Sequence, residues 1–247
     1  MPCSTSEIGS DMKYLFKPKT NLEKFGIKVF SVLVENFSQT FFVGGMVRDL
    51  LLGKKIVDID IATQAKPDEI VKLLRLANIL VDEKFKNFGV IIARQGNFQV
   101  EITTLRKDLK SASRYTKVVF VNDPKLDSQR RDFTINSLYL SGVTGQILDF
   151  HEGIKDLTNK TLRFIGNPKN RITEDPLRIL RGLRFSLILG FKIEKKSLSA
   201  INKYFNLLKI ISKTKMDTEL NKIPEKKLKL LLLNVLTAKK ILDKQFK

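Results

Sequence analysis

The spacing of apolar residues changes along the chain, and this change limits the folds that the sequence can adopt. Between residues 40 and 150, helical spacing is interrupted by short β-branched runs, of which VDIDIAT (57–63) alternates most strictly. From about Asn167 onward the spacing is helical throughout. The sequence therefore predicts a mixed α/β unit followed by an all-α unit.

Turn residues and local spacing place the individual elements of the α/β unit. Pro67 suits the first turn of a helix, and residues 95–97 suit the turn of a hairpin. We expect helices at 21–37, 46–53, 67–77 and 130–139, strands at 40–43, 57–63, 89–94, 98–105 and 147–150, and a loop at 107–117.

The charge of the chain is strongly positive and unevenly distributed. There are 45 Lys and Arg side chains against 26 Asp and Glu, a net charge of +19. Residues 1–150 have 22 basic and 17 acidic side chains, whereas residues 151–247 have 23 and 9. The surplus favours a polyanionic partner for the second half; a solvated basic face, or membrane-surface binding by the last helix, is the alternative.

Other features of the composition exclude several classes of protein. No segment is long and apolar enough to span a bilayer, and the first residues lack the apolar core of a secretory signal. We therefore expect a cytoplasmic protein with no membrane partner. Cys3 and His151 are the only cysteine and histidine, so no pattern for a structural zinc site or a cysteine nucleophile exists. Any chemistry must depend on carboxylates and a metal ion.

A pair of acids in the alternating run is the first candidate for that chemistry. Asp58 and Asp60 should share one face of a strand, with Val57, Ile59 and Ile61 pointing into the core. Two adjacent carboxylates repel each other unless a divalent cation lies between them. Oxygen ligands and a phosphate-bearing substrate together favour Mg²⁺. The alternative is an exposed strand with two solvated acids.

A third acid lies on a later predicted strand. Glu101 alternates with Val100 and Ile102, which we expect to be buried, so its carboxylate would lie beside the acid pair if the two strands are neighbours. Three acids on one sheet are typical of a two-metal site.

A glycine pair precedes the acids by about a dozen residues. Gly44 and Gly45 close a strand and open a helix, where backbone N–H groups can approach phosphate oxygens. Arg48, one turn into that helix, can add a bidentate phosphate contact. The combination of GGMVRDLLLG and DID at this spacing predicts a phosphate and metal site.

The use of arginine also points to nucleotide binding. The chain has 33 Lys and only 12 Arg, and a planar guanidinium is needed where geometry as well as charge matters. Half of the arginines fall in three short segments. These are Arg48, Arg130, Arg131, Arg178, Arg181 and Arg184.

The last of these segments, EDPLRILRGLRF, predicts a stripe of side chains along one helix. Asp175, Arg178, Arg181 and Arg184 are three residues apart. An acid beside an arginine offers both a donor and an acceptor, which suits the Watson–Crick edge of cytosine or adenine. An intrahelical Asp175–Arg178 ion pair is the alternative.

Taken together, GGMVRDLLLG, DID, VEITTLR, RRDFTIN and EDPLRILR resemble the motifs of the class II tRNA nucleotidyltransferase (CCA-adding enzyme) and bacterial poly(A) polymerase family. The resemblance implies an α/β nucleotidyltransferase head, a small mixed sheet with helices, followed by an all-α neck and body. The implied domains are an N-terminal extension (1–20), a catalytic head (21–166) and a helical neck and RNA-binding region (167–247).

The resemblance also implies roles for individual residues. Asp58 and Asp60 would bind the catalytic metals, and Glu101 would be the third catalytic acid. The implied nucleotide-binding residues are Gly44, Gly45, Arg48, Arg131, Asp132, Asn136, Asp175, Arg178, Arg181 and Arg184.

Within that set the implied tasks differ. RRDFTIN would contact the sugar and phosphates. Asp175 and Arg178 would pair with the incoming base and switch from CTP to ATP. Arg181 and Arg184 would support that helix and the nucleotide.

The implied function is template-independent addition of CMP and AMP, from CTP and ATP, to tRNA 3′ ends by a two-metal mechanism with Mg²⁺. Poly(A) polymerase and CC-adding activities are alternatives within the family, and a non-catalytic RNA-binding protein is an alternative of another class.

Ala112-Ser113 replaces the usual Asp-Gly of a loop that is linked to ATP acceptance. Residues 225–247 would pack on the neck, with RNA binding and homodimer formation as the alternatives, so both monomer and homodimer stay open.

Overall fold

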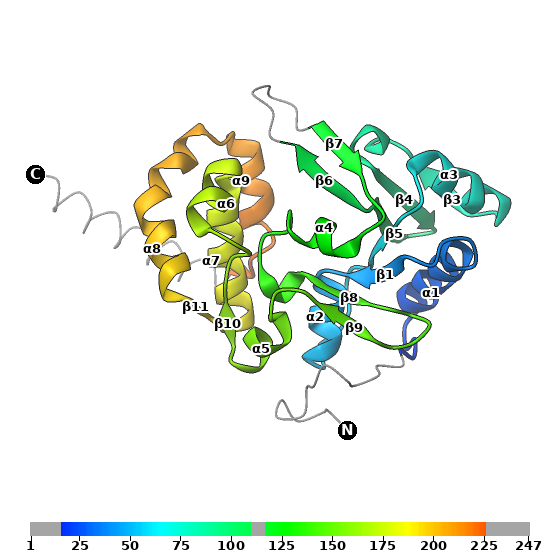
Figure 1. The fold of residues 1–247 in the computed structure, drawn as a ribbon, viewed down its shortest axis with the longest axis horizontal. Helices are drawn as coiled ribbons and strands as arrows, with labels where there is room; N and C mark the ends of the chain where they lie inside the picture. Colours follow the sequence, from blue (N-terminus) through cyan, green and yellow to red (C-terminus); the bar gives the residue numbers. More distant parts are fainter. Residues whose placement is uncertain (1–15, 110–116, 226–247) are drawn as a thin grey trace, which may run out of the picture. The chain divides into compact units, whose positions relative to one another are not determined.

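A computed structural model of the chain describes residues 16–109 and 117–225 (Figure 1). The chain divides into two compact units, Met1–Thr158 and Asn159–Lys247. This division falls before residue 166, where the sequence places the end of the head. Within the described ranges, no helix is long and apolar enough to cross a membrane.

The first unit is built on a seven-stranded sheet with the strand order β3-β4-β5-β2-β1-β8-β9. Strands β2 and β5 pair in parallel, and the other neighbours are antiparallel, so the sheet is mixed as the sequence predicts. The strands are β1 (Thr40–Val43), β2 (Asp60–Thr63), β3 (Leu80–Asp82), β4 (Val90–Gln95), β5 (Phe98–Thr104), β8 (Leu138–Leu140) and β9 (Ile147–Asp149).

Short helices surround this sheet, and their ends follow from local sequence. Helix α1 starts with a capping box, in which the Thr20 hydroxyl accepts from the Glu23 N–H and the Glu23 carboxylate accepts from the Thr20 N–H. Helix α3 starts at Pro67. The helices are α1 (Asn21–Val34), α2 (Gly45–Leu51), α3 (Pro67–Leu76), α4 (Pro124–Ser128) and α5 (Gly153–Thr158), with 3₁₀ turns η1 (Lys86–Phe88) and η2 (Thr134–Asn136).

The two faces of the sheet carry different residues. Helix α1 covers one face, where the Phe30 ring stacks on Phe42 with centroids 4.5 Å apart (Figure 1). The opposite face carries a cross-strand row, because Val43 pairs with both Tyr139 and Asp60, and Asp60 pairs with Glu101. An apolar cluster supports this row. Its buried members are Phe41, Val43, Ala62, Leu105 and Tyr139.

A small hairpin extends from the first unit and corrects the loop predicted at 107–117. Strands β6 (Arg106–Leu109) and β7 (Lys117–Phe120) pair in an antiparallel ladder, so the ends of that segment are strands. Residues 110–116, with Ala112-Ser113, lie outside the described residues, as does most of segment 225–247.

Two further expectations about local structure are wrong. Residues 130–139 form no α-helix. Their apolar residues Phe133 and Ile135 are two apart, and the chain makes a 3₁₀ turn before it enters β8. Val57 does not point into the core. It is 62% exposed because β2 begins only at Asp60.

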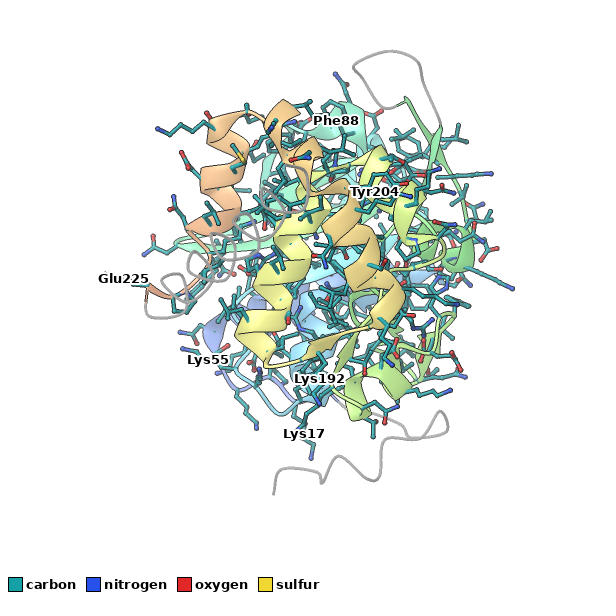
Figure 2. All side chains as sticks on the ribbon, turned by 90° about the vertical axis from the view of Figure 1, so that its left-hand side faces the viewer. Lys17, Lys55, Phe88, Lys192, Tyr204 and Glu225 are labelled. Atoms are coloured by element: carbon teal, nitrogen blue, oxygen red, sulfur yellow. The ribbon has the colours of Figure 1, made fainter. Side chains whose placement is uncertain are left out.

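The second unit is mainly helical over its described part, as the sequence predicts. One exception is β11, whose two residues pair in parallel with β10. Figure 2 shows Lys192 and Tyr204 towards opposite ends of the β11–α8 segment. The elements are β10 (Thr161–Leu162), α6 (Pro168–Glu174), α7 (Leu177–Leu189), β11 (Lys192–Ile193), α8 (Lys195–Tyr204), η3 (Phe205–Ile210) and α9 (Lys213–Leu220).

Candidate active site

The three acids of the predicted metal site are Asp58, Asp60 and Glu101, which we call the acid site. The structure brings two of them onto adjacent strands. Asp60 at the start of β2 pairs directly with Glu101 in the middle of β5, so the strand adjacency on which the third acid depended is present. Val100 and Ile102 are fully buried on the other face, which leaves Glu101 exposed. Asp58 lies just before β2 and is exposed, whereas Asp60 is partly buried.

The electrostatics of Asp60 are unusual for an aspartate. Burial raises the pKa of Asp60 to about 7, and the negative charges of Glu101 and Asp58 act in the same direction. The positive charges of Arg131 and Arg48 lower this pKa but only in part. The site therefore favours additional positive charge beside Asp60 at neutral pH.

The glycine turn lies directly against the acid site. Gly44 has φ +71° and ψ −136°, a conformation that side chains with a Cβ rarely adopt. A Cβ on Gly44 would also lie 3.0 Å from Oδ2 of Asp60. Both constraints require glycine here. Because glycine has no Cβ, the backbone of the turn can lie close to a group that binds to Asp60.

Arg48 connects the glycine-turn motif to RRDFTIN. Its side chain is buried, and Nε and Nη2 donate to the two carboxylate oxygens of Asp49 at 2.9 and 2.8 Å. Nη1 donates to Oδ1 of Asn136 at 2.8 Å. Sequence reasoning missed Asp49, although a carboxylate next to a motif arginine was a visible signal. Arg48 is thus oriented by two neighbours within the first unit.

Two other residues of RRDFTIN are also held by hydrogen bonds. Arg131 donates to the carboxylate of Asp127 and, from Nε, to the Tyr139 hydroxyl at 2.9 Å. The Asp132 carboxylate accepts from the backbone N–H of Phe133 at 2.8 Å. Asp127 and Tyr139 were not predicted from sequence. Asp127 could have been found, because it precedes Arg130 and Arg131 at ion-pair spacing.

The donor set of the acid site fits a divalent cation that is shared with a substrate. Within residues 16–109 and 117–225, no three Asp, Glu, His or Cys side chains are grouped tightly enough to hold a metal ion alone. Mg²⁺, however, is commonly held by one or two carboxylates together with substrate phosphates and water. Asp58 and Asp60 supply two carboxylates, and the pKa of Asp60 is raised by burial and by the charges of Glu101 and Asp58, which a bound cation would offset.

The second unit contains the predicted base-reading residues, and here the helix prediction needs correction. Asp175 is not part of a continuous stripe, because α6 ends at Glu174 and Asp175 has an extended backbone (φ −149°, ψ 97°). Pro176 follows it and disfavours helical geometry at the preceding residue. The Asp175 carboxylate accepts from the Leu177 N–H at 3.0 Å, which starts α7.

Arg178, for which an ion pair with Asp175 was the alternative to base reading, has partners on α6. Its Nη1 donates to the Arg171 carbonyl at 2.8 Å and to the Glu174 carboxylate at 3.1 Å. Further along α7, Nε of Arg184 donates to buried Glu219 of α9 at 3.0 Å. Arg181 also lies on α7. Glu174 and Glu219 were not predicted from sequence. Glu174 could have been found, because it precedes Arg178 at ion-pair spacing, whereas Glu219 is 35 residues from Arg184.

The fold and the acid site together define a class of protein. A mixed sheet with acids on adjacent parallel strands, beside a glycine turn, is the head of a nucleotidyltransferase, which confirms the predicted fold class. Residues 40–163 match the family described as the poly A polymerase head domain, and the chain belongs to this family.

Curated relatives and solved structures agree with that family. The CCA-adding enzyme of Enterococcus faecalis is 44% identical over 187 residues, which cover 75% of this chain and 45% of that enzyme. The mitochondrial CCA tRNA nucleotidyltransferase 1 of Mus musculus is 39% identical over 191 residues, or 74% and 44% of the two chains. This chain thus spans about half the length of the curated relatives it matches.

The structural comparison gives a similar result. The Bacillus stearothermophilus CCA-adding enzyme in complex with CTP has a TM-score of 0.73 and is 29% identical, with 85% of this chain and 49% of that chain covered. A tRNA nucleotidyltransferase with a primer tRNA and an incoming ATP analog has a TM-score of 0.67 and is 30% identical, with 83% and 58% covered.

Proposed function

We propose that this chain adds CMP and AMP, from CTP and ATP, to the 3′ end of tRNA without a nucleic-acid template. The observation that supports this most is the pairing of Asp60 with Glu101 beside the Gly44 turn, in a chain 44% identical to a CCA-adding enzyme. The names of the relatives favour CCA addition over polyadenylation. The partners of the reaction are tRNA, CTP and ATP.

In the proposed reaction, the 3′-hydroxyl oxygen of the RNA forms a bond to the α-phosphorus of the nucleotide. The bond from that phosphorus to the pyrophosphate oxygen breaks, pyrophosphate leaves with the electron pair of that bond, and the hydroxyl proton passes to water. Asp58 and Asp60 would hold Mg²⁺, which favours ionisation of the hydroxyl and offsets the charge of pyrophosphate. Glu101, next to Asp60 in the strand pairing, is the third acid.

The glycine turn and the arginines of the first unit bind the triphosphate in this proposal. Gly44 and Gly45 let the backbone approach the phosphates. Arg48 and Arg131 supply positive charge, and both are oriented by hydrogen bonds to neighbouring side chains. Asn136 accepts from Arg48, while Asp132 belongs to the same motif and is assigned to the sugar.

The choice of base is assigned to the second unit. Asp175 and Arg178 would offer an acceptor and donors to the base. In support of this, Arg178 is oriented by Glu174 and the Arg171 carbonyl, so its guanidinium has a defined direction. Arg181 and Arg184 would stabilise α7, and the buried contact of Arg184 with Glu219 is consistent with that task.

A single extension assay tests the proposal. The purified chain is incubated with Mg²⁺ and a tRNA that lacks its 3′ CCA, together with CTP, ATP or both, and the products are sized on a gel. We expect extension that requires CTP first and stops after three nucleotides. A long ladder with ATP alone would replace the proposal by poly(A) polymerase activity.

Two other outcomes would also overturn it. Extension that stops after two cytidines, even with ATP present, identifies a CC-adding enzyme. Binding of the tRNA without any extension identifies an RNA-binding protein. A parallel reaction with EDTA in place of Mg²⁺ should show no extension, and addition of excess Mg²⁺ should restore it.

The cytoplasmic location stays a prediction, and so do the domain boundaries of the head and neck.

A further inference from the structure

A buried carboxylate outside the acid site binds the arginines of RRDFTIN. Asp127, at 0% exposure, accepts hydrogen bonds from the Arg106 backbone N–H at 3.1 Å and the Tyr139 hydroxyl at 2.6 Å. It also accepts from Nε of Arg130 at 2.8 Å and from Nη2 of Arg131 at 3.2 Å. We name Asp127, Arg106, Arg130, Arg131 and Tyr139 the Asp127 cluster.

The carboxylate of this cluster is ionised. Burial alone would raise the pKa of Asp127, but the charges of Arg131 and Arg130 and the hydrogen bonds it accepts lower the pKa below its ordinary value. A buried charge is tolerated only when it is paired and hydrogen-bonded. The cluster is therefore a fixed anionic anchor for two guanidinium groups.

The anchor occupies one edge of the Arg131 guanidinium. Nε bonds to the Tyr139 hydroxyl and to Asp127, and Nη2 bonds to Asp127. The remaining nitrogen, Nη1, lies 3.7 Å from the position that a Cβ on Gly44 would occupy, beside the Asp60 carboxylate. The guanidinium thus reaches from the cluster to the glycine turn.

The position of Tyr139 in the sheet also fixes the orientation of the Arg131 guanidinium. Tyr139 lies in the cross-strand row that includes Val43 and Asp60, so its ring and the acid site share one rigid face. The Arg131 guanidinium carbon lies 5.1 Å from the centre of the Tyr139 ring. Two hydrogen bonds to one oxygen of Asp127, one to the Tyr139 hydroxyl and a ring contact together leave the Arg131 side chain little rotational freedom.

We propose that Asp127 and Tyr139 are positioning residues for the nucleotide triphosphate. They hold one edge of Arg131 so that Nη1 faces the phosphates at the Gly44 turn. The inference rests on the proposed function only in taking a nucleoside triphosphate as the ligand. A purely structural role would stabilise the head but would not distinguish a triphosphate from a monophosphate.

Direct binding tests this role. The affinities of the full chain for CTP and for CMP are measured by calorimetry in Mg²⁺, for the wild type, Tyr139→Phe and Asp127→Asn. We expect each variant to lose about tenfold in CTP affinity, because a misplaced guanidinium weakens its phosphate contact, with CMP affinity nearly unchanged. Tyr204→Phe, which removes the same hydroxyl group from α8, should change neither affinity.

The two variants differ in their risk of misfolding, so the test stays decisive if one of them does not fold. Tyr139→Phe removes one oxygen and retains the buried ring, so it should fold even if Asp127→Asn does not. Equal losses for CTP and CMP, or no loss of CTP affinity in Tyr139→Phe, would show that the cluster is only structural. A wild type that binds CTP no more tightly than CMP would also overturn the proposal.

Failure of this inference can be told apart from failure of the proposed function. The binding measurements do not depend on tRNA extension, so they report on Arg131 even in a chain that transfers no nucleotide. Where extension is observed, Tyr139→Phe should raise KM for CTP and ATP about tenfold with a much smaller change in kcat. A fall in kcat at constant KM would contradict positioning of the bound triphosphate.

Discussion

Asp60 and Asp127 are two aspartates of the first unit that both lie near Arg131, yet their pKa values are shifted in opposite directions. The pKa of Asp60 is raised to about 7, whereas the pKa of Asp127 is lowered. Asp127 accepts hydrogen bonds from two arginines and a tyrosine, while the nearest acids to Asp60 are Glu101 and Asp58.

The comparison separates a carboxylate that is already paired with protein groups from one that is ready to bind a cation. Where the protein supplies the positive charge itself, as at Asp127, the carboxylate is saturated by protein groups. Where it places acids beside one another, as at Asp60, Arg131 and Arg48 offset the negative charge only in part, and a bound cation would offset the rest. Four substitutions or conditions test this difference, from the largest expected effect to the smallest.

The largest effect should come from Asp60→Asn. The amide has the same shape but cannot bind a cation as a carboxylate does, so tRNA extension should fall more than about 10³-fold. The amide also removes repulsion from Glu101 and Asp58, so the melting temperature without metal should not fall. Extension is measured with saturating CTP and Mg²⁺.

Asp68→Asn is the matched control for that substitution, because the Asp68 side chain is 86% exposed on α3. It should extend tRNA at the wild-type rate. If Asp60→Asn retained a tenth of the wild-type rate, Asp60 would not be a metal-binding residue.

A smaller effect, on stability, should come from Asp127→Ala. This substitution leaves the buried ends of Arg130 and Arg131 without their shared anion and should cost about 4 kcal/mol of unfolding free energy. Asp60→Ala should cost far less, or should stabilise the chain in the absence of divalent cations. Urea unfolding of both variants in EDTA measures the difference. Equal losses would remove the distinction between the two aspartates.

The sequence was sufficient to predict the elements that depend on local pattern. The strand at β1, the helix that starts at Pro67 and the hairpin of β4 and β5 follow from alternation and turn residues. The mixed sheet and the helical second unit follow in the same way. The helix predicted at 130–139 is wrong, because Phe133 and Ile135, two residues apart, are both buried at a 3₁₀ turn that leads into β8.

The candidate site also contains residues that could be predicted from local sequence and contacts that could not. Asp58, Asp60 and the glycine pair form compact motifs and were visible in the sequence. Two contacts that orient the motif arginines were not visible, because Asn136 meets Arg48 across 88 residues and Glu219 meets Arg184 across 35. Such contacts are set by the packing of distant segments, for which one sequence contains no direct signal. Asp175 was placed on the wrong element because the effect of Pro176 on the preceding residue was overlooked.

The pH dependence of stability should also differ between the two aspartates. In the unfolded chain Asp60 ionises near pH 4, but in the folded chain its pKa is about 7, so the unfolded state releases this proton first. The contribution of Asp60 is therefore full below pH 4 and is lost as pH rises through 7. The shift corresponds to about 4 kcal/mol at most, and we expect about 2 because Asp60 is partly exposed.

Unfolding free energies of the wild type and Asp60→Asn at pH 4.5 and 7.5, without divalent cations, measure this contribution. The wild type should lose stability relative to the variant as pH rises, and Mg²⁺ at pH 7.5 should recover part of the loss. Asp127 acts with the opposite sign, because its lowered pKa contributes stability that is lost as pH falls through that pKa. Parallel profiles for the wild type and Asp60→Asn would contradict the assignment of the raised pKa to Asp60.

The smallest effect that still separates the acid site from its surroundings should come from Gly44→Ala compared with Gly53→Ala. Both glycines have positive φ, +71° and +62°, so each substitution should cost at least about 1 kcal/mol in backbone strain, and more at Gly44, whose ψ of −136° lies outside the left-handed region. At Gly53 a Cβ would meet nothing within 4 Å, whereas at Gly44 it would lie 3.0 Å from Oδ2 of Asp60. Gly44→Ala should therefore cost about 1 kcal/mol more in urea unfolding, because the Asp60 carboxylate must shift. That shift should also lower the affinity for Mg²⁺ and CTP, while Gly53→Ala leaves both unchanged. Equal effects of the two substitutions on CTP affinity would mean that the turn does not shape the space beside Asp60.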